Sequence, residues 1–176
     1  MKELFGQYLT KLYQDVPQEV YVGLLALFCF GAVIIIACCG LKHGWRKIVG
    51  LLLAEYVFVI YCSTVIFRTA ADGNGHEFEP FWSYKAIENG RVELLAENMM
   101  NVVVFVPVGI LLGLTCHNVR WWQVSYICFL ISVSIETMQY FLHRGFAETD
   151  DVMHNTLGCL IGYGIYSLVK IGYERI

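Results

Sequence analysis

The sequence predicts an all-α integral membrane protein: a helical bundle of five transmembrane helices, preceded by an amphipathic helix in the membrane interface. Of its 176 residues, 57% are hydrophobic and 15% are charged, whereas a soluble domain has about 25% charged residues. The apolar residues are also gathered into runs, most of which approach the roughly 20 residues that cross a hydrocarbon core as a helix. We therefore expect one compact bundle and no second domain.

Residues 1–17 are expected to form the interfacial helix, because their apolar and polar side chains separate onto two faces at helical period. The apolar face comprises Leu4, Phe5, Tyr8, Leu9, Leu12, Tyr13 and Val16. This segment is too polar to span a membrane, so it should lie along the surface. Pro17 then separates it from residues 18–176, which are predicted to form a single transmembrane domain.

The five predicted spans cover residues 20–41, 48–67, 101–116, 124–142 and 153–173. The third is short, so it is expected to use residues 97–100 as its first turn, with a kink at Pro107.

The connection "KHGWRK" (42–47) has three Lys or Arg residues and no acid, which places it in the cytoplasm. The segment 68–100 then lies outside, where "ADGNG" predicts a turn and "VELLAEN" a short helix leading into the third span.

The cysteine and tryptophan residues are predicted to have structural roles. Seven cysteines lie in or beside apolar runs with no pair in the loops, so we expect small buried side chains rather than disulfides. The tryptophans are expected to anchor the bundle at the membrane interfaces, and they are Trp45, Trp82, Trp121 and Trp122.

The fourth span carries polar residues on one helical face, namely Glu136, Gln139, Tyr140 and His143. An ionisable group inside a membrane is costly, so it should face a partner or a polar cavity. A structural carboxyl group hydrogen-bonded between helices is the alternative, but the clustering favours function.

The fifth span begins with a second polar group. Asp151, Asn155, Gly158 and Gly162 share one helical stripe, and Asp150 and His154 form the neighbouring pair. The glycines allow another backbone to approach closely. Helix capping is the alternative for one aspartate, but it does not account for both together with His154 and Asn155.

Further polar residues are predicted at the same outer level, namely Arg68, Glu97, Asn101 and Arg144. Two arginines suit the phosphate of a lipid head group, and carboxylates can act as acid, base or ligands of a divalent cation. His143 and His154 match no zinc-site spacing. No basic stripe typical of nucleic-acid binding occurs.

The segments "ENMMNVVVFVPVGILLG" (97–113) and "IETMQYFLHRGFAETDDVMHNTLGCLIGYG" (135–164) resemble the VanZ family of small bacterial membrane proteins. "FRTA" (67–70) and "PFWSY" (80–84) are similar to its less strict motifs, although "HEFEPF" (76–81) lacks the Asn usual before Pro-Phe. The resemblance implies resistance to teicoplanin and related glycopeptides at the cell envelope, without an established reaction. It also implies kinship with phosphatidylserine synthases and enzymes of lipid-linked wall precursors, and it adds Glu148 to the site.

Three functions compete. The first is chemistry on a phospholipid or polyprenyl-linked head group at the outer leaflet of the cytoplasmic membrane. The predicted catalytic residues are Glu136, Gln139, Asp150, Asp151 and Asn155. The predicted binding residues, which hold the substrate, are Arg68, Glu97, Asn101, Arg144, Glu148 and His154. The second is capture of a lipid or antibiotic without turnover. The third, proton-coupled export through Glu55 or Glu136, is disfavoured because transporter sites lie near the midplane. A rhomboid-type protease is also disfavoured, since no Gly-x-Ser-x-Gly element occurs.

Overall fold

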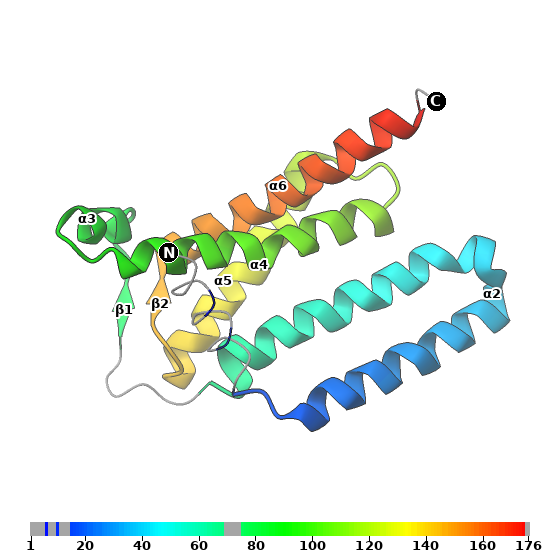
Figure 1. The fold of residues 1–176 in the computed structure, drawn as a ribbon, viewed down its shortest axis with the longest axis horizontal. Helices are drawn as coiled ribbons and strands as arrows, with labels where there is room; N and C mark the ends of the chain where they lie inside the picture. The colour runs from blue at the N-terminus through cyan, green and yellow to red at the C-terminus, as the bar shows by residue number, and fades with distance from the viewer. Residues whose placement is uncertain (1–5, 7–9, 11–14, 69–74, 175–176) are drawn as a thin grey trace.

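The protein is almost entirely helical, as expected. The computed structural model describes residues 6, 10, 15–68 and 75–174, and the ordered elements follow one another along the chain (Figure 1). They are α2 (Gln18–Tyr61), η1 (Cys62–Ile66), β1 (His76–Glu77), α3 (Trp82–Glu88), α4 (Glu93–Thr115), α5 (Trp121–Leu142), β2 (Ala147–Glu148) and α6 (Thr149–Glu174). Most of the predicted interfacial helix (1–17) and of the predicted turn at 71–75 lies outside the described residues.

Helix α2 folds back on itself and supplies the first two predicted spans. Gly40 has φ 68° and ψ 158°, a non-helical conformation inside the α2 range, and the two limbs run side by side in opposite directions (Figure 1). A positive φ is accessible to Gly at no steric cost. The predicted loop at 42–47 is therefore wrong: the chain turns at Gly40, and those residues already belong to the second limb.

Helices α4 and α6 pack with their backbones in direct contact. A Cβ atom added at Gly158 or Gly162 would collide with the carbonyl oxygen of Val102 or Val106, and one at Gly109 would collide with that of Cys159. This is the close approach that the glycines of the fifth span predicted. Helix α4 begins at Glu93, before residues 97–100, and remains helical through Pro107.

Helix α5 completes the core. Buried apolar side chains from α4, α5 and the end of α2 form one cluster, which includes Ile60, Phe105, Val108, Val124 and Ile135. Cys128 and Cys159, both fully buried, belong to it and are joined as a disulfide with Cα atoms 6.5 Å apart. The expectation of no disulfide is therefore wrong. The prediction that the cysteine side chains are buried is also wrong for Cys29, Cys38 and Cys116, which are exposed on the protein surface.

Residues 75–92, which lie between η1 and α4 in the chain, form a small cap. Strand β1 pairs in parallel with β2, with His76 opposite Ala147 and Glu77 opposite Glu148, and α3 lies above the start of α4 (Figure 1). The short helix predicted for VELLAEN (92–98) is the first part of α4, which begins at Glu93, whereas α3 and the strand pair were not predicted.

Among the described residues, three helices are long and apolar enough to cross a membrane: α4, α5 and the combined α2 and η1. That first helix doubles back, so it has two apolar limbs. Helix α6 has 26 residues, or about 39 Å at 1.5 Å per residue, with Asp150, Asp151 and Asn155 in its first turns and Lys170 near its end. The all-α membrane bundle predicted from the sequence is confirmed.

Candidate functional site

The start of α6 carries two polar stripes that face different parts of the protein. One stripe consists of Asp150 and His154, and both contact the cap segment 81–84. The other consists of Asp151 and Asn155, which contact α4 and α5. The helical phase separated these two pairs correctly, but it did not indicate what either pair faces.

Asp150 anchors the beginning of α3. Its Oδ1 accepts a hydrogen bond from the Phe81 N–H at 2.6 Å, and its Oδ2 accepts from the N–H and hydroxyl of Ser83 at 3.0 and 2.6 Å. The Asn98 amide in turn donates to the Ser83 hydroxyl at 3.0 Å. Asp150 and Ser83 are both fully buried. This carboxylate therefore joins α6 to the cap.

Two aromatic residues of the cap bind predicted site residues. Trp82 Nε1 donates to Glu148 Oε2 at 2.9 Å, and the Tyr84 hydroxyl lies 2.8 Å from His154 Nε2. Trp82, predicted as a membrane anchor, thus contacts a site residue, whereas Trp45, Trp121 and Trp122 are exposed. Sequence reasoning did not assign site roles to Trp82, Ser83 and Tyr84, although the segment "PFWSY" carried the signal.

The second stripe of α6 connects the three core helices. The Asn101 amide of α4 donates to Asp151 Oδ1 at 2.6 Å, and the Asn155 amide donates to Ser132 Oγ of α5 at 2.8 Å. Ser132, which is fully buried, was not predicted. It lies one turn before Glu136 on the same face of α5, so that spacing was the available signal.

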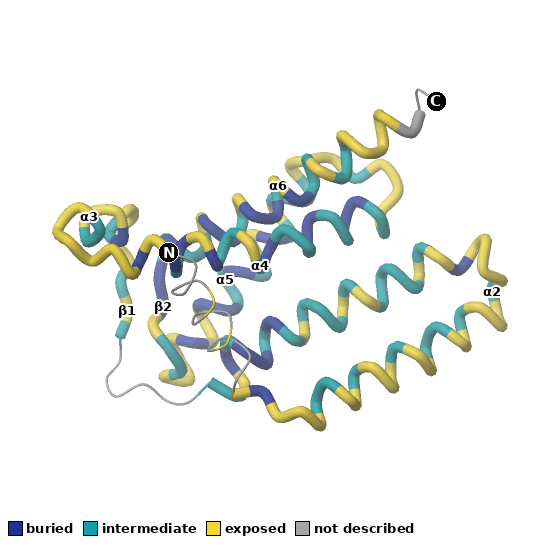
Figure 2. The backbone as a smooth tube through the Cα atoms, in the orientation of Figure 1, coloured by how far each residue is buried: buried dark blue, intermediate teal, exposed yellow. Residues whose placement is uncertain are grey.

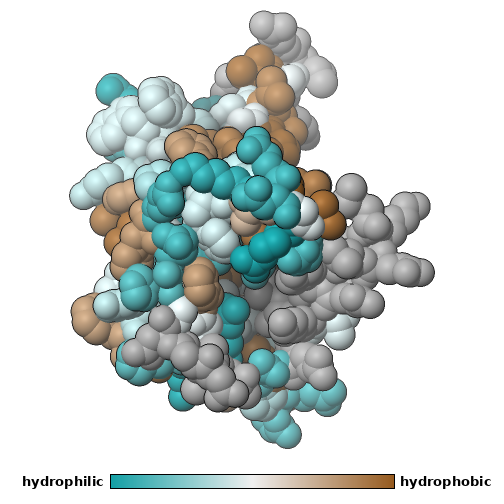
Figure 3. Space-filling view, turned by 90° about the vertical axis from the view of Figure 1, so that its left-hand side faces the viewer, coloured by the Kyte–Doolittle hydropathy of each residue, from teal (hydrophilic) through white to brown (hydrophobic). Residues whose placement is uncertain are grey.

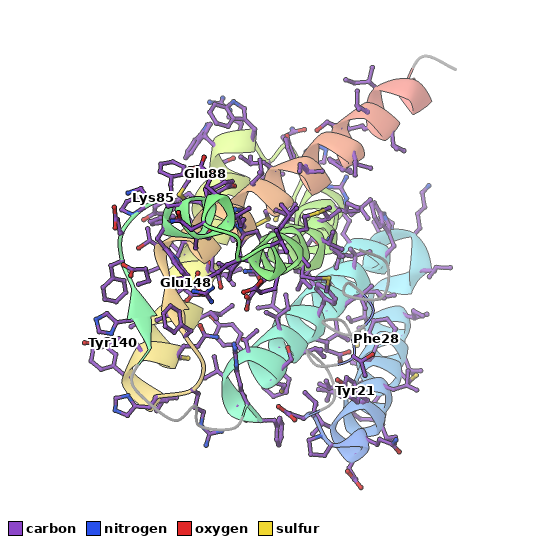
Figure 4. All side chains as sticks on the ribbon, turned by 60° about the vertical axis from the view of Figure 1, so that its left-hand side comes forward. Tyr21, Phe28, Lys85, Glu88, Tyr140 and Glu148 are labelled. Atoms are coloured by element: carbon purple, nitrogen blue, oxygen red, sulfur yellow. A yellow bond between two sulfur atoms is a disulfide. The ribbon has the colours of Figure 1, made fainter. Side chains whose placement is uncertain are left out.

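Carboxyl groups gather where these elements meet. Glu136 Oε2 accepts a hydrogen bond from the Glu148 N–H at 2.9 Å, and both side chains are 8% exposed. Burial, with the negative charges of Asp151 and Glu97 adding, raises the pKa of Glu148 from 4.5 to about 8. This carboxyl group therefore holds a proton at neutral pH. Figure 4 shows Glu148 beneath α3, with Lys85 and Glu88 on the outer side of that helix.

The two predicted arginines differ in their contacts. Arg144 donates to the backbone carbonyls of Val65, Ile66 and Arg68, so its guanidinium closes the end of η1. Arg68 packs against Gly145, where an added Cβ would lie 2.6 Å from Arg68 Cζ. Its charge acts favourably on Glu136 and Asp151. Of the two, Arg68 is the one whose charge acts on the carboxyl groups.

Only part of the predicted face of α5 points inward. Glu136 and Gln139 are buried, and Gln139 Nε2 donates to the Thr64 carbonyl at 3.1 Å. Tyr140 and His143 are exposed, and Tyr140 packs against the rings of His76 and Phe78 instead. The four-residue stripe predicted from the helical phase is therefore wrong in its second half: Tyr140 is helical but exposed, and His143 lies beyond Leu142, where α5 ends.

These groups lie at one end of the bundle. Hydrophilic side chains gather across this end, with hydrophobic ones along its flanks (Figure 3). Within the described part of the chain, no three His, Cys, Asp or Glu side chains are grouped to hold a metal ion. A pocket of about 220 Å³ lies instead toward the other end of α6, lined by Tyr163, Tyr166 and Lys170 among others. We place the candidate site at the carboxyl groups, because the buried ionisable residues are there.

Fold and site define an integral membrane helical bundle with buried carboxyl groups at one end. The sequence model of the family described as VanZ/LLP1 matches residues 20–170, and the chain belongs to this family. The chain is also similar to Protein VanZ of Enterococcus faecium, at 28% identity over 72 residues. That match covers 41% of this chain and 45% of the relative, so it spans less than half of the relative's length. No solved structure matches the chain.

Proposed function

We propose that this protein contributes to glycopeptide resistance of the teicoplanin type by acid–base chemistry on a lipid-linked head group. The substrate is a phospholipid or a polyprenyl-linked wall precursor in the outer leaflet of the bacterial cytoplasmic membrane. The observation that carries the proposal is the group of Glu136, Glu148 and Asp151 beside Arg68 at one end of an apolar bundle. Buried ionisable residues in a membrane protein mark a functional site by default.

In this proposal each charged group has one step of the chemistry. Arg68 binds a non-bridging oxygen of the phosphate, which suits the forked donors of a guanidinium. Asp151 or Glu136 accepts the proton of the attacking hydroxyl as its oxygen bonds to phosphorus. The bond from phosphorus to the leaving oxygen breaks, and Glu148 gives that oxygen its proton. The raised pKa of Glu148 keeps this proton in place at neutral pH.

The remaining predicted residues hold this arrangement. Asp150 and His154 fasten the cap over the site, and Arg144 closes η1 beside it. Asn101 orients Asp151 through the 2.6 Å hydrogen bond. In this proposal Asp150 and Arg144 act as positioning residues, and the outward orientation rests on the basic segment at 42–47.

Lipid mass spectrometry of expressing cells tests the proposal. Wild type, Glu136→Gln and Asp151→Asn are compared at matched protein levels, together with teicoplanin susceptibility. Glu88→Gln is the matched control, because Glu88 is exposed on α3. We expect a head-group or polyprenyl species that changes with wild type and with Glu88→Gln but not with either site variant.

Capture of a lipid or antibiotic without turnover is the competing function, and the same experiment separates the two. Lipid profiles that never change, combined with resistance lost in Glu136→Gln and Asp151→Asn, would replace the enzymatic proposal with capture. Resistance and lipids unaffected by both substitutions would remove the carboxyl groups from the function altogether.

A further inference from the structure

The candidate site is rich in hydrogen-bond acceptors and poor in donors. Its acceptors are the carboxyl groups of Glu97, Glu136 and Asp151 and the side-chain oxygens of Gln139 and Asn155. The amide nitrogens of Asn101, Gln139 and Asn155 already donate to Asp151, to the Thr64 carbonyl and to Ser132. A ligand that brings hydrogen-bond donors therefore suits this site.

Two of these acceptors have no donor among the residues that the structure describes. Gln139 and Asn155 are 4% and 5% exposed, and within the described residues their Oε1 and Oδ1 atoms are covered and have no hydrogen-bond partner. Buried polar atoms are normally paired, so each exception requires an explanation. Gln139 lies one turn after Glu136 on α5, and Asn155 lies one turn after Asp151 on α6. Both oxygens therefore belong to the helical stripes that carry the carboxyl groups.

Arg68 supplies the opposite chemistry beside them. Among the described residues it forms no ion pair within 4.0 Å, since the pairs found there are Lys85–Glu79 and Arg91–Glu93 on the cap. Its charge nevertheless acts on Glu136 and Asp151. A site for an anion therefore lies next to a site for a hydrogen-bond-donating cation.

We infer that the site binds a zwitterionic lipid head group, with a primary ammonium among the acceptors of Glu136, Asp151, Gln139 and Asn155 and its phosphate on Arg68. The inference rests on the proposed function, because it names the class of head group that the site takes. A purely anionic head group would bring negative charge to the carboxyl groups and no cation. A quaternary ammonium would bring the charge but no N–H donor for the two amide oxygens.

Binding of short-chain lipids to the purified full chain, measured by native mass spectrometry, tests this inference. The probes are dihexanoyl phosphatidylethanolamine, phosphatidylcholine and phosphatidylglycerol, which differ in the donor and charge of the head group. We expect phosphatidylethanolamine to bind at least about tenfold more tightly than phosphatidylglycerol, with phosphatidylcholine between them. Phosphatidylglycerol binding as tightly as phosphatidylethanolamine would overturn the inference.

Variants assign the selectivity to the named atoms. Gln139→Met and Asn155→Leu remove the unpaired oxygens, so phosphatidylethanolamine should fall to the affinity of phosphatidylcholine while phosphatidylglycerol is unchanged. Arg68→Gln should weaken all three lipids, and the exposed Glu88→Gln should weaken none. If Gln139→Met or Asn155→Leu fails to fold without lipid, Glu136→Gln replaces it, and loss of this carboxyl group should weaken phosphatidylethanolamine and phosphatidylcholine relative to phosphatidylglycerol. Selectivity unaltered in the folded variants would contradict the inference.

Soluble phosphoethanolamine distinguishes a lipid from its free head group. It should compete only weakly, since the acyl chains hold the lipid at the protein; equal competition would mean that the lipid part is not recognised. The inference and the proposed function can fail separately. Selective binding without any change in cellular lipids would contradict only the enzymatic proposal. Changed cellular lipids without selective binding would contradict only the inference about the head group.

Discussion

The α2 hairpin and the α4–α6 bundle are both apolar, yet they are built differently. Only Gly44 and Ile60 of α2 are buried, and its most apolar window contains no buried residue. In α4 and α5 about a third of the corresponding window is buried, 39% and 33%. Figure 2 shows the same contrast, with buried residues concentrated in α4, α5 and α6 and exposed ones along both limbs of α2.

The contrast indicates what holds a membrane bundle together. Lipid is as apolar as Leu, so hydrophobic side chains alone give helices no reason to associate. The α4–α6 contact uses glycines that bring the backbones together, and polar pairs such as Asn101–Asp151 add to it. In the described part of α2 a few polar contacts reach the bundle, among them the Tyr56 hydroxyl on the Val104 carbonyl at 2.9 Å.

The largest expected effect comes from filling the glycine contact. Gly158→Leu would force a side chain into the Val102 carbonyl, and we expect a loss of about 3 kcal/mol, at the upper end of overpacking. Gly23→Leu in the hairpin is the matched control, since no atom lies within 4 Å of an added Cβ there. Thermal unfolding in mild detergent measures both. Equal stability of the two variants would contradict the conclusion that close glycine packing stabilises the α4–α6 contact and not the hairpin.

The next effect concerns the anchor of the cap. Asp150→Ala removes the acceptor of three hydrogen bonds and leaves the N–H groups of Phe81 and Ser83 without it. We expect a loss of about 2 kcal/mol and faster amide hydrogen exchange over residues 81–88. Asp15→Ala, at an exposed position before α2, should change neither quantity. Unaltered exchange in Asp150→Ala would show that α3 is held by other contacts.

A pH-dependent effect should separate the bundle from the hairpin. The pKa of Glu148 is raised from 4.5 to about 8, so between these values the folded protein holds a proton that the unfolded chain has released. The contribution of Glu148 to stability should therefore fall as pH rises through this window, by at most about 1.4 kcal/mol per pH unit. Unfolding midpoints at pH 5, 6.5 and 8 measure it.

Glu148→Gln should remove this part of the pH dependence, because the amide does not titrate. Glu19→Gln, in the exposed first turn of α2, should retain the wild-type dependence. Parallel curves for wild type and Glu148→Gln across the whole window would mean that Glu148 is ionised in the folded protein.

The smallest expected effect is the loss of one hydrogen bond between cap and bundle. Tyr84→Phe removes the hydroxyl that lies 2.8 Å from His154 Nε2, at a cost of about 1 kcal/mol. Tyr126→Phe, at an exposed position of α5, should leave the unfolding midpoint within error. A cost that is as large for Tyr126 as for Tyr84 would argue against the cap contact.

Sequence patterns were sufficient to predict the long apolar helices, the family and one face of α6. Apolar runs report helices in a membrane because backbone polar groups must be paired within the segment there. Helical phase placed Asp151 and Asn155 with Gly158 and Gly162, since residues three and four apart lie on one side of a helix. These are local properties, which the chain specifies before any tertiary contact forms.

Only the tertiary structure decided what each polar residue touches. Arg68 and Arg144 have the same charge and lie at the same predicted level, yet the charge of Arg68 acts on carboxyl groups and Arg144 binds backbone carbonyls. Trp82 contacts Glu148, 66 residues away along the chain, and Asp150 holds Ser83 across 67. Such contacts depend on how a loop folds back over the helices. The conformation of a loop is determined by long-range partners rather than by neighbouring residues, so the sequence contains no periodic pattern that predicts it.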